Sequence, residues 1–497
     1  MRSAVCRARW SYQPVILCES AHGVRSALSE FKAAPMVWSA VLLAMVVSQT
    51  VICSLIAVAT IIDQDYQGPE QELGSSYTGP ALAFSVIITV AVLLWVMNSA
   101  LNQRRHQLAL MVLQGALPWQ LLAWNLLIVM GLCILSIAAT CLLLPVITPL
   151  IFAMVTNPLD LHLTYASSHL FNSLGKGLAF SAAPIFISTL LTIRSLSKIR
   201  PMEALRQSQN PPKRIGVFRF LLGIVCLIGA GCMLLIPAFA LATNPPASQM
   251  SSNAAADRMT VFLAFVMGGM FLQIFSLAAF APYFLPGFTA IWTRIVALPS
   301  RTWRLAGQQA VGSIQRQGAA IIPMTAGLSL LMTVGGGLST MITTMQVALP
   351  PTPDSTVPAT ADMFASLLAL TGPPLIIAIT GAIAGTLITS KGRGLDLALT
   401  YVSGAGIGQL RVLGALDGII TMITSTLFSL VITLLCTSSL TFMLSRFMGK
   451  AQMSVQWGAW IVVVLIASLL GAAATGIQAL TTRFENSVSV ISHAIGE

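Results

Sequence analysis

The sequence predicts an all-α polytopic membrane protein, and three observations carry that prediction. Of the 497 residues, 56% are hydrophobic and only 8% are charged, whereas a soluble globular protein has about 25% charged residues. The apolar residues gather into runs of membrane-spanning length, and the segments between the runs alternate in charge. So few charges cannot cover a water-facing surface of this size, which excludes a soluble enzyme, a disordered protein and a secreted disulfide scaffold.

Ten apolar runs are long enough to cross a bilayer. A hydrocarbon core of about 30 Å needs about 20 apolar residues per helix, and a helix satisfies its own backbone groups in lipid. The runs are much too long for barrel strands. They lie near residues 36–62, 80–101, 120–153, 171–193, 217–243, 260–291, 318–345, 366–390, 413–444 and 457–481.

The charges predict which side each loop occupies. Basic residues cluster in alternate loops, such as Arg194–Arg219 and Lys391–Arg411, while Asp63–Glu72 is acidic without a base. The positive-inside rule therefore places both termini in the cytoplasm, and we expect a bacterial plasma membrane. Because the net charge of +11 comes from clusters beside apolar runs, we interpret it as topology and expect no nucleic-acid partner. The eight cysteines form no CxxC or Cys/His cluster, so no metal site is expected.

Two basic loops repeat at an offset of 289 residues. RRHQLALMVLQGALPWQL begins at Arg104 and RGLDLALTYVSGAGIGQL begins at Arg393, with eight identical positions. Pro35-Met36 and Pro323-Met324 keep nearly the same offset, as do Leu191-Thr192-x-Arg194 and Leu480-Thr481-x-Arg483. This agreement predicts two parallel four-helix units joined by a helix pair, rather than the inverted repeats common in secondary transporters.

The repeat sets the predicted domain boundaries. Residues 1–35 form a cytoplasmic segment whose Leu17, Ala21, Val24, Leu28 and Phe31 spacing predicts an amphipathic helix on the inner leaflet, with a flexible basic leader as the alternative. The first unit is 36–210, the linking helices are 211–292, the second unit is 293–485, and 486–497 is a cytoplasmic tail.

The repeated loop carries a continuous apolar run just beyond a basic patch. Apolar surface left in water costs about 25 cal/mol per Å², so the run must pack on something. One interpretation is a cytoplasmic stalk and short helix docked into a groove on a partner. The other is the cytoplasmic end of a long, tilted second or eighth span. Because the loop occurs twice, and a dimeric partner offers two equivalent grooves, we favour docking.

At these residues the chain resembles the FtsX-like (MacB-type) permeases of ABC transporters. LMVLQGAL (Leu110 to Leu117) and LTYVSGAG (Leu399 to Gly406) stand where that family has the coupling helix that touches its ATPase, and the family's closing signature appears as Pro201-Met202-Glu203-Ala204-Leu205-Arg206. The resemblance covers roughly 36–206 and 320–483. The signature is absent after the tenth span, and the family's frequent large external domain is missing, leaving small extracellular loops.

The resemblance implies a set of functional residues. It assigns a cytoplasmic motif to Pro201, Ala204, Leu205 and Arg206. It assigns ATPase coupling to Arg104, Leu108, Leu110, Gly115 and Ala116 in the first copy and to Arg393, Leu397, Leu399, Gly404 and Ala405 in the second. Residues that contact substrate are not indicated.

The expected function is that of a permease subunit that is not itself an enzyme. The chain has no GxxxxGK[ST] loop, so it binds no cofactor of its own, and ATP and Mg would be bound by a separate cytoplasmic ABC ATPase, expected in two copies. We expect export or extraction of an amphiphilic or hydrophobic substrate from the lipid bilayer. A subunit that transports nothing and pulls on an extracytoplasmic or lipid-linked partner is the alternative, and a secondary transporter or channel is a third.

Overall fold

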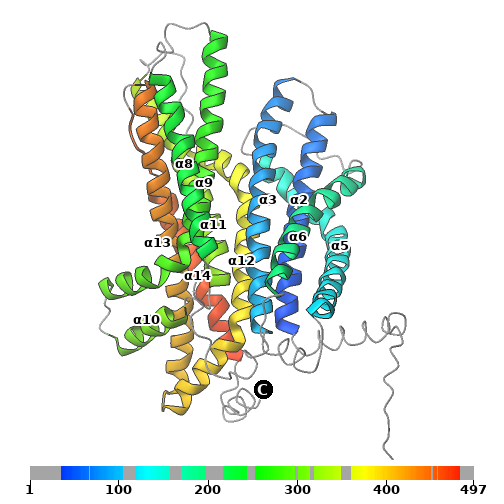
Figure 1. Cartoon of the computed structure of the whole chain (residues 1–497), viewed down its shortest axis with the longest axis vertical. Coiled ribbons are helices and arrows are strands. Elements are labelled where there is room, and N and C mark those ends of the chain that lie inside the picture. Colours follow the sequence, from blue (N-terminus) through cyan, green and yellow to red (C-terminus); the bar gives the residue numbers. More distant parts are fainter. Residues whose placement is uncertain are drawn as a thin grey trace, which may run out of the picture.

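The structure is a computed structural model that describes residues 35–65, 68–104, 118–156, 170–196, 217–242, 252–296, 300–313, 318–348, 360–448, 451–455 and 457–481. Regular secondary structure in these ranges is entirely helical. Figure 1 shows two groups of long helices side by side, with α3 of one group against α12 of the other. The predicted all-α class is therefore confirmed for the described residues.

The first group holds four helices and the second holds seven. The first comprises α2 (Pro35–Asp65), α3 (Pro69–Gln103), α5 (Pro118–Thr156) and α6 (Leu170–Leu196). The second comprises α8 (Val217–Ala242), α9 (Ser252–Ile295), α10 (Arg301–Ser313), α11 (Gly318–Ala348), α12 (Thr360–Val402), α13 (Ile407–Met448) and α14 (Trp457–Thr481). Proline opens α2, α3 and α5, a position where its missing N–H and fixed φ cost nothing.

Several helices have the length and composition of membrane spans. Among the described residues seven qualify: Pro35–Asp65, Tyr77–Gln103, Ala123–Thr156, Ser173–Thr192, Ile321–Thr344, Ala369–Ile388 and Ile407–Ser445. The bent pair Gly268–Ala281 and Tyr283–Ile295 of α9 passes the same test only when its two parts are taken together. Each of the ten runs predicted from sequence lies in one of the helices, to within a residue at its ends. These helices give the chain the character of a multi-pass membrane protein.

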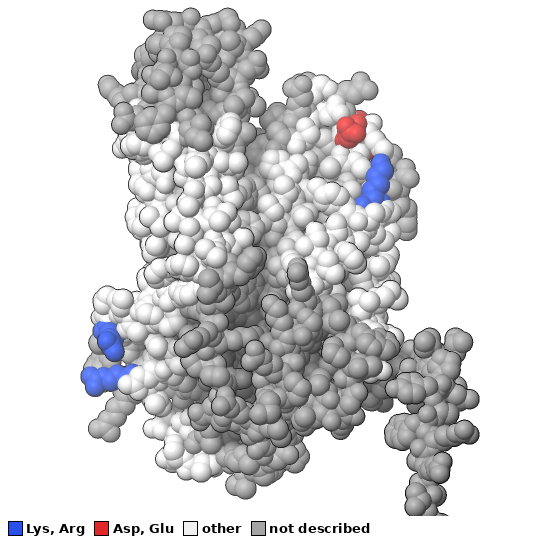
Figure 2. All heavy atoms as spheres, in the orientation of Figure 1, with Lys and Arg blue, Asp and Glu red and all other residues white. Residues whose placement is uncertain are grey.

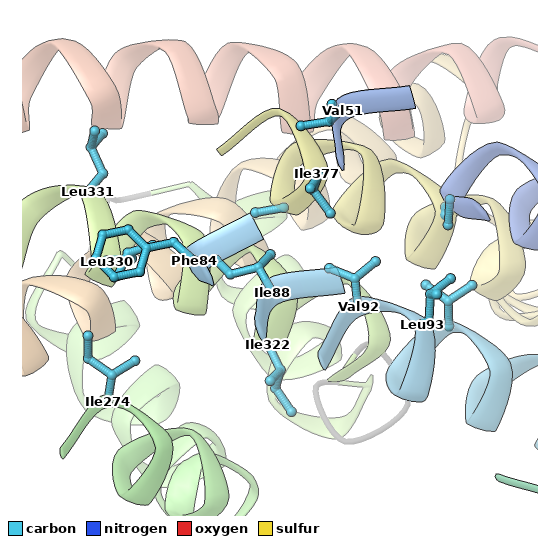
Figure 3. Close-up of a cluster of buried hydrophobic side chains, with 14 of the residues drawn as sticks. Val51, Phe84, Ile88, Val92, Leu93, Ile274, Ile322, Leu330, Leu331 and Ile377 are labelled. Atoms are coloured by element: carbon cyan, nitrogen blue, oxygen red, sulfur yellow. The ribbon is translucent and has the colours of Figure 1, made fainter. Parts of the chain in front are cut away.

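The core lies where the two groups meet. Helix α2 contacts α3, α5, α6 and α12, while α11 contacts α3, α12 and α13. Figure 3 shows buried side chains from five helices in one cluster, including Val51, Ile88, Ile274, Leu330 and Ile377. The closest approach of α3 and α12 depends on a glycine: a Cβ built on Gly381 would lie 2.6 Å from Cγ1 of Val92. At this point the Val92 side chain of α3 therefore packs directly on the backbone of α12.

The outer helices present apolar side chains outward. Leu142 on α5 is 78% exposed and Leu469 on α14 is 72% exposed. The set includes Leu135, Val146 and Leu150 of α5, Phe186 and Leu190 of α6, and Ile461 and Leu465 of α14. Surface of this kind is costly in water and free of cost in hydrocarbon, which agrees with helices that face lipid.

Hydroxyl groups link the third helix of each predicted unit to the first. In one group, Thr50 Oγ1 lies 3.4 Å from Thr140 Oγ1, and Thr148 Oγ1 lies 3.2 Å from Ser54 Oγ. In the other, Thr325 Oγ1 lies 3.0 Å from Ser425 Oγ. The residues at the predicted offset agree in kind: Ser136 and Ser425, Thr140 and Ser429, Thr148 and Thr437. The groups differ in the fourth helix, since α6 packs on α2 and α3, whereas α14 packs mainly on α13.

The charges of the described residues separate toward the two ends of the bundle. Asp63 and Asp65 are exposed where α2 ends, and Arg104 lies at the opposite end of α3. Figure 2 shows Lys and Arg at the lower corner, near α10, and Asp or Glu at the upper end beside a single basic patch. That basic patch lies on α6, where Lys176 is exposed. Lys176 in α6, Arg258 in α9 and Arg446 in α13 lie on the side predicted to be outside, so the distribution follows the predicted sidedness only in part.

Candidate functional site: the helix elbows

The second repeated loop is an elbow between α12 and α13. Helix α12 runs unbroken to Val402, and α13 begins at Ile407, so residues 403–406 make the whole turn. Gly404 has φ of 101°, in the left-handed region that glycine adopts without penalty. The N–H of Gly404 donates to the carbonyl of Tyr401 at 2.9 Å, and the N–H of Ala405 donates to that of Thr400 at 3.3 Å. These two bonds form a Schellman motif, which satisfies the last carbonyls of α12.

The start of α13 is capped from within the same turn. The N–H of Gly406 donates to Oε1 of Gln409 at 3.2 Å, which is the return half of a capping box. The N–H of Leu410 then donates to the Gly406 carbonyl at 3.1 Å as the helix begins. Both helix ends are thus closed by local bonds, and the elbow is a defined structure rather than an open connection.

One side of the elbow is buried against helices of the same chain. We call this contact the elbow cluster; its buried residues are Trp292, Trp303, Ala306, Ala310, Leu410, Leu413 and Ile420. The indole N–H of Trp292 donates to Thr424 Oγ1 at 3.0 Å, and that of Trp303 donates to the Thr293 carbonyl at 3.4 Å. The two indole rings meet edge to face, with centroids 6.1 Å apart. This cluster fixes the elbow on α10 and on the end of α9.

The other side of the elbow is apolar and exposed. Val402 is 62% exposed, and Ile407 and Val412 are also exposed, at 43% and 50%. Gly404, Gly406 and Gly408 lie between them, and a Cβ on any of the three would meet no atom within 4 Å. Arg411 stands exposed beside Val412. The tip therefore offers a small apolar knob with open backbone and a positive charge.

The elbow stands beyond the end of the neighbouring helix. The Gln103 side-chain amide at the end of α3 donates to the carbonyl of Ile388 in α12, which sets the two parallel helices level there. From Ile388 to Val402, α12 continues for fourteen residues, and at 1.5 Å rise per residue this is about 21 Å. There is no break at 390–393, so the stalk expected there is the uninterrupted end of a long helix.

Nine of the ten predicted coupling residues fall into three groups, and Arg104 is the tenth. Gly404 and half-buried Ala405 form the turn just described. Arg393, Leu397 and Leu399 lie in the last three turns of α12, with side chains outside the described part. Leu108, Leu110, Gly115 and Ala116 of the first elbow lie outside the described residues, as do Pro201, Ala204, Leu205 and Arg206 and the predicted N-terminal helix.

Arg104 marks the start of the first elbow. Its backbone N–H closes α3 by donating to the Leu101 carbonyl at 3.1 Å. Its side chain is buried, and the guanidinium carbon lies 5.2 Å from the centroid of a Trp38 ring in α2. A cation held over an indole face is attracted by the ring's quadrupole. This contact ties the inner ends of α2 and α3 together, a role that the sequence did not reveal.

Buried polar side chains lie at the middle of the two central helices of the first group. Ser85 and Thr89 share the face of α3 that includes Val92, the residue packed on Gly381 of α12. Their hydroxyl oxygens, like Oε1 of Gln49 in α2, are buried without a hydrogen-bond partner among the described residues. An unsatisfied buried polar group costs about 1–3 kcal/mol. These buried hydroxyl groups therefore make the packed arrangement less stable at its centre. A hydropathy scan does not detect them, because they lie within apolar runs.

Helix α10 is the largest element that sequence reasoning missed. It has only thirteen residues, too few for a membrane span. The pattern that could have revealed it is Trp303, Ala306 and Ala310, which recur on one helical face and are all buried.

Comparisons add no relative to these observations. No protein-family model matches the chain, and a search of curated proteins finds no match. Within the part of the chain that the structure describes, no group of three or more His, Cys, Asp and Glu residues could hold a metal ion.

Proposed function

We propose that this chain is the membrane subunit of an ABC transporter of the FtsX-like (MacB-type) kind, in the bacterial plasma membrane with both termini in the cytoplasm. Ten of the described helices, all except α10, would cross the membrane as two four-helix units with α8 and α9 between them. The observation that carries the proposal is the second elbow: a long helix that ends about 21 Å beyond its neighbour, closed by a glycine turn, with exposed Val402 and Ile407 at its tip.

The elbow has the properties of a handle for a second protein. Its tip is apolar, so docking into a groove removes Val402 and Ile407 from water. Its base is held by the elbow cluster, so a push on the tip is transmitted to α9, α10 and α13 together. A flexible loop could not transmit such a push. Two copies of a cytoplasmic ATPase would bind the two elbows and supply ATP hydrolysis, with ATP and Mg on the ATPase.

The two-unit arrangement supports this proposal. Helix α13 begins 289 residues after α5, the same offset as the repeated loops. Ser and Thr residues of α5 and α13 recur at that offset. Thr148 of α5 and Ser425 of α13 each bond to the first helix of their own group, although the two stand at different positions of the repeat. Parallel repeats with both elbows at one end would receive force from one side of the membrane.

Substrate would move through the contact of α2, α3, α11 and α12. These helices are packed together here, so passage of an amphiphile between them requires separation at contacts such as Val92 with Gly381. The orphaned hydroxyls of Ser85 and Thr89 make separation less costly, because they gain partners in the opened state. The expected substrate is a lipid, a hydrophobic drug or a peptide with a polar and an apolar part.

The tight central packing also supports the second candidate, a subunit that transports nothing and transmits motion to an extracytoplasmic partner. Only residues 66–68 separate α2 from α3 at the end away from the elbows, so little surface is available there to grip such a partner. Stimulation of ATP turnover by a membrane amphiphile favours transport, whereas stimulation only by an external protein favours transmission.

Co-purification with the ATPase tests the proposal directly. Ile407→Glu places a charge on the elbow tip, and we expect it to release the ATPase from the complex. Met453→Glu is the matched control, because Met453 is a similarly exposed apolar residue beyond the opposite end of α13. A complex that survives Ile407→Glu and Val402→Glu would refute docking at this elbow, and equal loss with Met453→Glu would show that the charge acts through misfolding.

A further inference from the structure

The last part of α9 lies across the bundle rather than along it. The helix bends by 77° between Gly268–Ala281 and Tyr283–Ile295, where Pro282 interrupts the backbone hydrogen bonds. The part of α9 before the bend packs along α8, so the segment after the bend runs across the bundle rather than along it. Figure 1 shows this part of the chain projecting sideways beside α10.

This crosswise segment has two distinct faces. Leu285, Thr289 and Trp292 are buried against the bundle. Phe284, Ile291 and Ile295 recur at positions i, i+7 and i+11 and are 59%, 60% and 77% exposed. A helix with an apolar outer stripe that lies along the surface of a membrane protein has the form of an interfacial helix, whose apolar side enters the boundary between headgroups and acyl chains.

Three exposed arginines surround the same corner. Arg294 follows Thr293, whose carbonyl accepts the Trp303 indole N–H, and Arg304 follows Trp303. Arg411 lies between Leu410 and Leu413 of the elbow cluster. Figure 2 shows this basic corner at the lower left. The described segments 268–296, 300–313 and 400–416 contain no acidic residue, and Asp417, the next residue of α13, is buried at 7% exposed. The exposed charge of the described residues at this corner is therefore positive.

We propose that the end of α9, α10 and Arg411 form a binding surface for anionic phospholipid of the inner leaflet. The arginines would bind the phosphate of the headgroup, and Phe284, Ile291 and Ile295 would contact the acyl chains. The charge of the corner favours an anionic lipid over a zwitterionic one, and the crosswise stripe favours a membrane over a soluble protein. Since α10 packs on the elbow, bound lipid holds the elbow cluster in place, which makes the handle sensitive to the composition of the leaflet.

Lipid retention measures this directly on the full chain without any ATPase. The chain is reconstituted in vesicles of equal parts phosphatidylglycerol and phosphatidylcholine with identical acyl chains, extracted in detergent, and its retained lipids are quantified. Each arginine near a membrane surface contributes about a fivefold preference for anionic lipid. We expect the wild type to retain phosphatidylglycerol in preference, and Arg294→Gln with Arg304→Gln and Arg411→Gln to abolish the preference.

Two controls separate charge from folding and lipid from free phosphate. Replacing the three arginines by lysine keeps the charge and should keep the preference, and Lys176→Gln, a cation near the opposite end, should leave it unchanged. Soluble glycerophosphoglycerol without acyl chains should not compete. An equal retention of both lipids by the wild type, a preference that survives the triple glutamine variant, or equal loss with Lys176→Gln would overturn the inference. If the triple glutamine variant lost ATPase binding but retained phosphatidylglycerol as the wild type does, the inference would also be overturned. That result would assign the corner to the ATPase.

Discussion

Gly404→Ala isolates the conformational contribution of the elbow turn. A Cβ at this position meets no atom within 4 Å, so the substitution introduces no clash. The effect comes entirely from the φ of 101°, which an L-residue adopts at a cost of about 1–2 kcal/mol. The turn should therefore open about 5 to 30 times more often.

Amide hydrogen exchange in lipid nanodiscs measures that opening. The amides of Gly404, Ala405 and Leu410 are donors in the turn and in the first turn of α13, so the exchange of a peptide that covers them reports the elbow. We expect protection there to fall by the same factor, while peptides from α2 and α11 keep their protection because the central packing is unchanged.

Gly408→Ala is the matched control. Gly408 is also exposed with open space around its Cβ, but it lies in the first turn of α13 and its φ is not positive. Alanine is favoured over glycine in a helix by about 1 kcal/mol or less, so protection should stay constant or rise. If Gly404→Ala leaves exchange unchanged, or if both variants lose protection equally, the left-handed glycine turn is not what closes α12.

Four further single substitutions and one double variant test the packing around the site by thermal unfolding in detergent. Thr89→Val removes a buried hydroxyl without a partner among the described residues and should leave the free energy of unfolding unchanged or raise it by about 1 kcal/mol. Thr325→Val removes a hydrogen-bonded hydroxyl and should lower the free energy of unfolding by about 1 kcal/mol. Equal losses in the two variants would show that Thr89 has a partner. Trp292→Phe removes the indole bond to α13 and should cost about 1 kcal/mol, and no change would mean that the bond is replaced by water. Gly381→Ala should cost about 1–3 kcal/mol by overpacking, and adding Val92→Ala should restore part of it if the two residues touch.

Hydropathy located the helices because lipid imposes a length on apolar runs. Each predicted run lies in a helix to within a residue at its ends, and most of the helices are longer than their runs. Helix α3 begins at Pro69, ahead of the predicted residue 80, and α12 extends from Thr360 to Val402 around the predicted 366–390. The added residues of α3 include Glu70 and Glu72, and those of α12 include Lys391 and Arg393. Such charges end a hydropathy run although the helix continues.

Features that depend on neighbouring helices were not predictable. The bend in α9 needs a bundle against which Trp292 can pack, and α10 is short because it covers an elbow rather than crossing the membrane. The contact of Arg104 with the Trp38 ring joins the end of α3 to the start of α2, and the whole hairpin of these two helices lies between them in the sequence. In contrast, the turn at Gly404 could be placed from sequence, since it follows an apolar run and its backbone conformation is accessible mainly to glycine.

In the proposed two-unit arrangement, the contact of Val92 with Gly381 lies between the units. The two residues are 289 positions apart, so equivalent positions of the repeats touch each other. A contact between equivalent positions is what a two-fold arrangement requires near its axis, where each surface meets its own copy. Two valines there would clash and two glycines would leave a void, because buried interiors tolerate neither. A valine opposite a glycine fills the space, which a homodimer of identical units could not achieve. Under the proposed arrangement, fusion of the two units into one chain would permit closer central packing than two separate copies could reach. Motion that the elbows imposed on the bundle would then pass through this contact.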